Sequence, residues 1–248
     1  MTAEDEAFQK WTGWIDAIHR DITDLVIGRH IFWEVQDIIK ANAKIQKPSS
    51  FYGWLGMTYA AWGPMGVRRQ LDMDTRSISL RRLLTEMART PQIVSRPRYV
   101  TTYATKLLGT SDPSPSIPEP ENERQGGAYA LGRSEAEDIA NKSFDDYAGQ
   151  GKQHISEDGI KRDLAELQSR SHKVERFATK KVAHLDERPP ATLPTFDELD
   201  ACVDLLEQLV LKYEMILKTS APQSLLPTWQ YDWKAIFREP WISSDGTR

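Results

Sequence analysis

The side chains best suited to acid–base chemistry gather near residue 180, where histidines and cations recur. His172, Arg176, Lys180 and His184 follow one another at four-residue steps, and Lys181 lies beside them. Residues four apart are neighbours on an α-helix, because each residue turns the chain by about 100°. The spacing therefore predicts a cationic ridge on a helix that ends before a proline-containing break.

Such a ridge has the groups that metal-independent RNA cleavage requires. His184 is the candidate general acid or base, because the pKa of an imidazole lies near neutral pH. Arg176 and Lys180 are the candidate catalytic cations that stabilise charge on phosphorus, and Lys181 and His172 are candidates for RNA binding. No cofactor and no metal are expected. An ordinary solvated helix end has a similar composition, since the helix dipole favours cations there.

Apolar residues recur at three- and four-residue spacing along most of the chain, which is typical of amphipathic helices. The pattern predicts a long or once-broken helix over 4–43, with Gly28 as its likeliest break. It also predicts a helix from residue 51 that Gly63-Pro64 kinks or ends, and a third helix that ends before Pro91.

The second half of the chain predicts an antiparallel helix pair, over 156–185 and from 195 to 217. The second of these opens with a capping box at Thr195 and Glu198, and a similar pattern at Ser134 to Glu137 suggests a further short helix. The architecture expected is an all-α antiparallel helical bundle forming a single domain over 1–248.

Two segments depart from the bundle pattern. Residues 110–152 begin with a Pro-, Ser- and Glu-rich stretch, so we expect a flexible insertion there. Residues 227–241 carry aromatic side chains at four-residue spacing, and we expect them to staple the C-terminus to the bundle.

Composition narrows the classes of function. The formal net charge of −4 argues against a protein that coats nucleic acid by bulk electrostatics. A single cysteine, Cys202, excludes an internal disulfide or a cysteine metal cluster. No run of about 18 apolar residues occurs, so we expect a cytoplasmic location and no membrane partner. The pairs Arg68-Arg69 and Arg81-Arg82 either guide phosphates or are solvated partners of carboxylates.

Three segments resemble a known family in their order along the chain. They are Lys180-Lys181-Val182-Ala183-His184-Leu185-Asp186, the stretch from Asp72 to Leu84 that contains Ser77-Ile78-Ser79-Leu80, and the ending Asp232-Trp233-Lys234-Ala235-Ile236-Phe237 with Pro240-Trp241. Together they are similar to the HEPN superfamily, particularly its AbiU-like abortive-infection group.

The resemblance implies a helical bundle that forms a homodimer and, in active members, a metal-independent endoribonuclease. Such proteins act in toxin–antitoxin systems and phage defence, which implies RNA as substrate and an antitoxin as a possible partner. Only His184 carries over directly, because Ala178 stands where the family has its motif arginine and Thr179 where it has asparagine. Either Arg176 or Lys180 replaces that arginine, or the protein is an inactive binding or regulatory module on the same fold.

Overall fold

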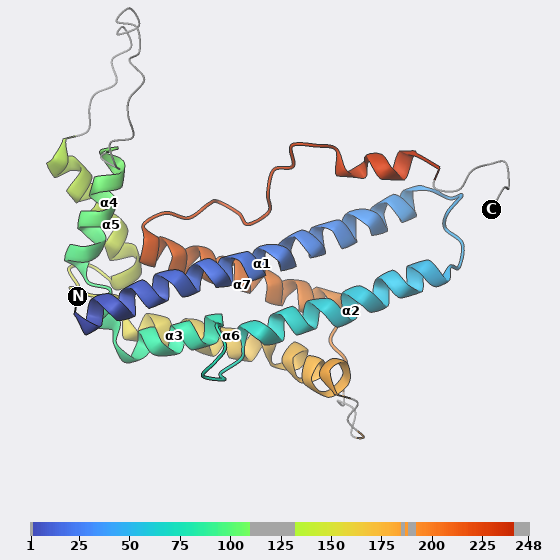
Figure 1. The fold of residues 1–248 in the computed structure, drawn as a ribbon, viewed down its shortest axis with the longest axis horizontal. Coiled ribbons are helices and arrows are strands. Elements are labelled where there is room, and N and C mark those ends of the chain that lie inside the picture. Colours follow the sequence, from blue (N-terminus) through green and yellow to red (C-terminus); the bar gives the residue numbers. More distant parts are fainter. Residues whose placement is uncertain (1, 110–131, 185–186, 188–191, 241–248) are drawn as a thin grey trace, which may run out of the picture.

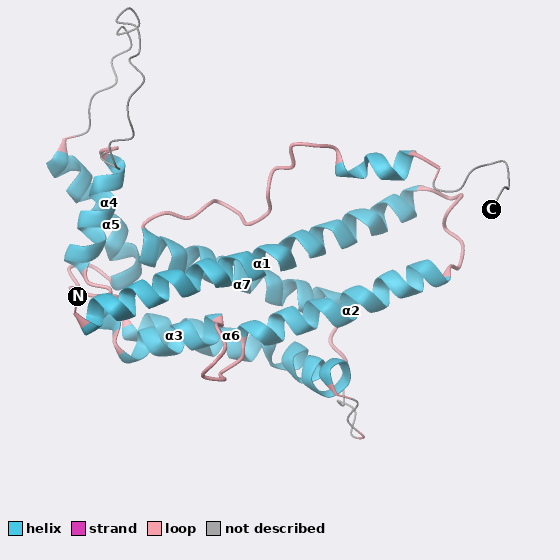
Figure 2. Ribbon diagram, viewed as in Figure 1, coloured by secondary structure: helices cyan, strands magenta, loops and turns pink. Residues whose placement is uncertain are grey.

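The computed structural model describes residues 2–109, 132–184, 187 and 192–240. Their regular structure is helical, and the described residues contain no strand, only an isolated bridge between Ser95 and His154 (Figure 2). The predicted all-α helical bundle is confirmed. The α-helices are α1 (Ala3–Ala41), α2 (Ser50–Gln70), α3 (Leu80–Arg89), α4 (Arg96–Leu107), α5 (Arg133–Ala148), α6 (Glu157–Phe177) and α7 (Phe196–Lys218). Shorter segments are the 3-10 helices η1 (Pro91–Ile93) and η3 (Trp233–Arg238) and the π-helical η2 (Ala178–Ala183).

Helix α1 runs the length of the bundle, and α7 packs along it (Figure 1). Helices α2 and α3 follow each other along another side of α1, while α6 packs against α3, α2 and α7. Helices α4 and α5 pack on each other and stand across the end of the bundle that holds the N-terminus. Among the described residues, no helix is long and apolar enough to cross a membrane.

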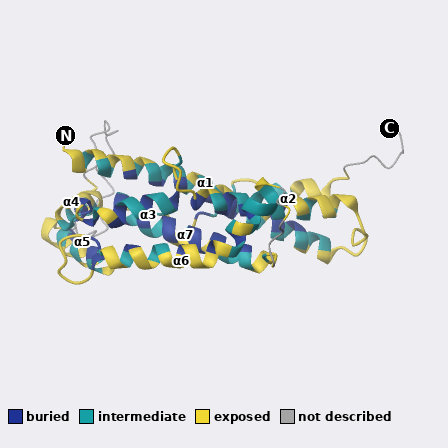
Figure 3. Cartoon of the chain, turned by 90° about the horizontal axis from the view of Figure 1, so that it is seen from below, coloured by how far each residue is buried: buried dark blue, intermediate teal, exposed yellow. Residues whose placement is uncertain are grey.

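The core lies where the apolar stripes of these helices meet, coloured dark blue in Figure 3. Burying one large apolar side chain contributes about 1.5–3 kcal/mol to the free energy of unfolding. The stripe of α1 therefore accounts for much of the stability of the bundle. The deeply buried residues of α1, α3 and α7 include Trp11, Ile15, Ile18, Ile22, Leu25, Leu83, Leu84, Leu206 and Tyr213.

The pairing of α6 with α7 is antiparallel, as predicted. Near the end of α6, the Lys173 ammonium donates to Glu198 at the start of α7, at 2.7 and 2.8 Å. Near the start of α6, Asp163 accepts hydrogen bonds from Lys212 and Tyr213 in the last turns of α7, each at 2.6 Å. The capping box of α7 is also confirmed, since Thr195 and Glu198 each accept the backbone N–H of the other.

Of the two possibilities for the first helix, the unbroken one occurs: α1 is one continuous helix of 39 residues, without a break at Gly28. A Cβ atom at Gly28 would overlap the indole ring of Trp62 on α2. This glycine therefore serves the close approach of two helices, a role that its sequence context does not distinguish from a helix break. Likewise, Gly63-Pro64 does not end α2, which continues to Gln70.

Residues 110–152 were expected to form a flexible insertion, and this prediction is wrong for the second half of that range. Residues 133–148 form α5, which packs against α4 and buries Ala136, Ala140 and Phe144 completely. The Arg96 guanidinium on α4 donates to the Asn141 side chain at 3.1 Å, which fixes the two helices together. Small apolar side chains allow this packing although the segment has few large ones. Residues 110–131 lie outside the described residues.

The C-terminal segment lies along the second half of α1 (Figure 1). The Trp229 ring stacks on the imidazole of His30, with centroids 5.2 Å apart, and Trp233 contacts the same imidazole edge-on. Lys234 pairs with Glu34 of α1. Both tryptophans keep part of their surface in solvent, so the aromatic staple expected over 227–241 is a surface contact with α1; Trp241 lies outside the described residues.

Two glycines of α1 provide a matched test of this packing. Gly28→Ala should lower the free energy of unfolding by about 1–3 kcal/mol, because the methyl group must displace Trp62. Gly13→Ala, on an open face of the same helix, should instead raise it by about 0.5–1 kcal/mol, because alanine favours helix. Urea unfolding followed by circular dichroism measures both. Equal effects of the two substitutions would contradict the close contact at Gly28.

Candidate anion-binding site at the end of α6

The predicted cationic segment lies at the end of α6, where the helix changes its geometry. Ser156 caps the start of α6 by accepting the Gly159 N–H at 3.1 Å, and Leu167 and Val174 hold the helix against the core. After Phe177 the chain continues as the π-helical segment η2, and at His184 the backbone is extended, with φ −138° and ψ 143°.

The continuous ridge predicted from four-residue spacing is therefore wrong. His172 and Arg176 are neighbours on the exposed face of α6, as expected. Beyond Phe177, π-type hydrogen bonds join residues five apart, so four-residue steps no longer stay on one face. Lys180 and Lys181 lie on the π-helical segment and are partly buried, whereas His184 is exposed and has left the helix.

The position of Ala178 explains why no arginine stands there. The side chain of Ala178 is completely buried, at the junction between α6 and η2. A guanidinium at this position would point into an apolar core, where an unpaired charge is strongly unfavourable. The small apolar residue is therefore required by packing at the place where the family resemblance leads one to expect arginine.

A guanidinium does reach this helix end, and it comes from α2. Helix α2 packs against η2, and the Nε–H of Arg68 donates to the Thr179 hydroxyl at 3.1 Å. Arg68 is half-buried, and Thr179 is the neighbour of the buried Ala178. Arg68 thus occupies the vicinity in which the motif arginine was expected.

Three cations near this end of α6 have no ion-pair partner among the described residues. Within the described ranges, Arg68, Arg176 and Lys181 have no carboxylate at ion-pairing distance, in contrast to Arg69, which pairs with Asp21 at 2.8 Å. The last carbonyls of a helix add partial negative charge and favour cations there. The arrangement provides positive charge and hydrogen-bond donors that a phosphate group can use.

The position of Arg68 is fixed by polar contacts at the end of α2. The fully buried Gln70 side chain donates to Asp21 at 2.6 Å and accepts the Leu80 N–H at 3.0 Å, so it ties α2 to α1 and to the start of α3. The turn between α2 and α3 is held by Asp72, whose pKa is lowered by hydrogen bonds from the Ser77 hydroxyl and the Asp74 amide. This explains the polar residues over 72–79.

From the sequence, Arg68 could not be distinguished as a phosphate contact from Arg69 or from the pair Arg81-Arg82. Arg68 and Arg69 are adjacent, yet one contacts η2 and the other pairs with Asp21 on α1. The helical period separates neighbouring residues by about 100°, so the two side chains were certain to diverge. Only the packing of α2 against η2 shows which of them reaches the candidate site.

An apolar cavity of about 190 Å³ lies next to the same helix end. The cavity is lined by Ala60 and Pro64 of α2 and by Phe177, the last residue of α6. Leu193 and Phe196, at the start of α7, line its other side. Among the described residues, no group of three or more histidine, cysteine or carboxylate side chains is placed to hold a metal ion.

A second polar network, centred on Asp200, serves packing. Its carboxylate accepts hydrogen bonds from the Tyr59 hydroxyl at 2.7 Å and from the Trp33 indole at 2.6 Å. Burial and the Asp200 carboxylate raise the pKa of Tyr59 far above its ordinary value, so this hydroxyl stays protonated. The network joins α1, α2 and α7 without offering a free reactive group.

Comparisons with protein-family models, with curated proteins and with solved structures found no match to this chain.

The buried position of Ala178 has a direct test. Ala178→Arg should lower the free energy of unfolding by about 3 kcal/mol or more, because it places a charge in the core. Ala183→Arg, at an exposed position of the same π-helical segment, should change it by less than about 0.5 kcal/mol. Thermal and urea unfolding compare the pair. A stable Ala178→Arg protein would show that the position is open to solvent.

Proposed function

We propose that this protein is a metal-independent endoribonuclease of the HEPN type that acts as a toxin or phage-defence effector. The observation that carries the proposal is the hydrogen bond from Arg68 to Thr179, because it brings a guanidinium to the helix end that leads to His184. The resemblance of the segment over 180–186 to the HEPN signature supports the same activity.

In the proposed reaction the 2′-hydroxyl of RNA attacks the neighbouring phosphorus, and the bond to the 5′-oxygen breaks. His184 transfers one of the two protons, either as the base for the 2′-hydroxyl or as the acid for the leaving oxygen. Arg68 and Arg176, with Lys180, stabilise the charge on the phosphate oxygens. His172 and Lys181 contact neighbouring phosphates. The products are a 2′,3′-cyclic phosphate and a 5′-hydroxyl.

Each chain contributes one His184, whereas the reaction moves two protons. We therefore propose a homodimer in which the second proton is transferred by His184 of a second copy. A cytoplasmic location, expected from the lack of a long apolar run, and an antitoxin partner, which the family resemblance implies, complete the proposal.

The alternative is a catalytically inactive binding or regulatory module. The exposure of His184 favours it, because a histidine in solvent lacks the fixed hydrogen-bond partner that usually orients a catalytic imidazole. In that case the cations near α6 bind an anionic partner without cleaving it.

RNA cleavage by the purified protein separates these possibilities. We expect cleavage that persists in EDTA and yields 2′,3′-cyclic phosphate ends. His184→Ala should reduce the cleavage rate by about 100-fold or more, and Arg68→Ala by a similar factor. Circular dichroism must show that each variant remains folded.

Two control substitutions remove an arginine and a histidine at other places in the protein. Arg162→Ala removes an exposed arginine from the start of α6, and His154→Ala removes a histidine near the start of α4. Both should retain full activity. If His184→Ala and Arg68→Ala cleave RNA as well as these controls do, the catalytic assignment is wrong. Unchanged RNA binding without any cleavage supports the inactive module instead.

A further inference from the structure

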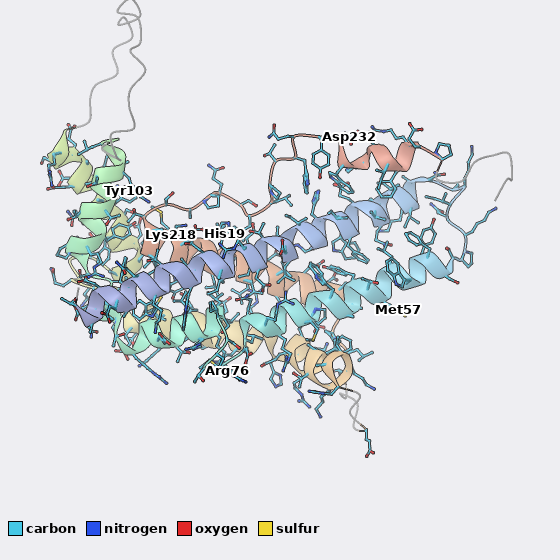
Figure 4. All side chains as sticks on the ribbon, viewed as in Figure 1. His19, Met57, Arg76, Tyr103, Lys218 and Asp232 are labelled. Atoms are coloured by element: carbon cyan, nitrogen blue, oxygen red, sulfur yellow. The ribbon has the colours of Figure 1, made fainter. Side chains whose placement is uncertain are left out.

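The far end of the hairpin formed by α1 and α2 exposes large apolar side chains. On α2, Phe51 is 49% exposed, Trp54 55% and Met57 67%, and Ile45 in the connecting loop is 37% exposed. Figure 3 shows this end of the hairpin as largely exposed, and Figure 4 labels Met57 on it. Such a concentration of exposed aromatic and aliphatic side chains is typical of a surface that contacts another phase or molecule.

Positive charge accompanies these apolar side chains. Lys40, Lys44 and Lys47 are exposed at the same end, and the sequence has no aspartate or glutamate between Ile38 and Leu71. Lys40 lies 3.8 Å from Asp37, in an exposed pair that water screens strongly. Within the part of the chain that the structure describes, Lys44 and Lys47 have no carboxylate at ion-pairing distance.

The shape of this end favours contact with a broad surface. The hairpin forms one end of an elongated molecule and extends past the end of α6 (Figure 1). Residues 41–51 are all exposed, so a surface approaching end-on meets Ile45 and Phe51 together with Lys44 and Lys47. Trp54 lies one turn behind them on α2.

We propose that the end of this hairpin binds the surface of an anionic lipid bilayer. The apolar side chains of Phe51, Trp54 and Met57 enter the interfacial region, and the lysines contact the lipid phosphates. Aromatic side chains prefer the bilayer interface, and lysines near it are attracted to anionic lipids. A second copy of the chain is disfavoured as a tip-to-tip partner, because the lysines would repel each other.

This peripheral contact does not rest on the proposed RNA cleavage. It revises the expectation of no membrane partner, which was based on the absence of a spanning segment. A surface contact needs no such segment, because the side chains enter the interface from one face only.

Flotation with lipid vesicles tests the proposal on the full-length protein. Vesicles of phosphatidylcholine with about 30% phosphatidylglycerol should bind at least about tenfold more protein than pure phosphatidylcholine vesicles, and added salt should weaken this preference. Phe51→Ser/Trp54→Ser/Met57→Ser should reduce the binding about tenfold or more. Lys44→Glu/Lys47→Glu should abolish the preference for phosphatidylglycerol.

Matched controls remove similar groups elsewhere. Ile78→Ser/Ile139→Ser changes two apolar residues of 45% and 44% exposure, and Lys142→Glu/Lys152→Glu reverses two exposed lysines. Both should bind vesicles like the unaltered protein. Thermal unfolding checks that the variants fold.

Absence of binding to anionic vesicles, or equal binding by hairpin and control variants, overturns the proposal. Light scattering that shows a dimer lost only in the Phe51/Trp54/Met57 variant, without vesicle binding, assigns the surface to a second copy.

Discussion

The burial of one face of α1 is the constraint on which the rest of the structure depends. This helix of 39 residues contacts α2, α3 and α7, and its stripe from Trp11 to Leu25 is almost completely withdrawn from water. Because close-packed interiors tolerate little change in volume, the positions of the neighbouring helices follow from this stripe. Helix α2 in turn determines where Arg68 meets η2. The candidate site is therefore fixed by apolar packing that lies far from any reactive group.

Hydrogen bonds between polar side chains of the bundle determine which helix faces lie against each other. Asp200 joins Trp33 of α1 to Tyr59 of α2, and Asp163 joins the start of α6 to the end of α7. Each carboxylate accepts two hydrogen bonds, so these polar groups are satisfied within the protein. Such contacts specify which helix faces pair, whereas apolar contacts are less selective about register. The bundle thus depends on apolar burial for stability and on carboxylates for its particular arrangement.

The sequence predicted the helical architecture well because helix periodicity and capping boxes are local signals. The apolar stripe of α1 and the capping box at Thr195 could be recognised without tertiary knowledge. The role of Gly28 could not, since a glycine that admits Trp62 has the same local signature as one that breaks a helix. Helix α5 was missed as a packed element because its buried residues include alanines, which give a weak apolar pattern. Arg68 was named as part of an arginine pair but could not be singled out, because its contact with Thr179 joins residues 111 positions apart in sequence.

The π-helical segment has a consequence for the use of spacing motifs. A rule such as arginine, several residues, then histidine assumes a constant number of residues per turn between the two positions. In η2 the hydrogen bonds span five residues, so the turn that leads to His184 holds one residue more than an α-helical turn. Two chains with the same spacing can therefore present different side chains to the same point in space. Conversely, a π-helical turn can accommodate one inserted residue, so that the residues before and after it keep their contacts with neighbouring helices. Relatives of such a protein are better aligned by the buried positions on either side of the segment than by counting from the histidine.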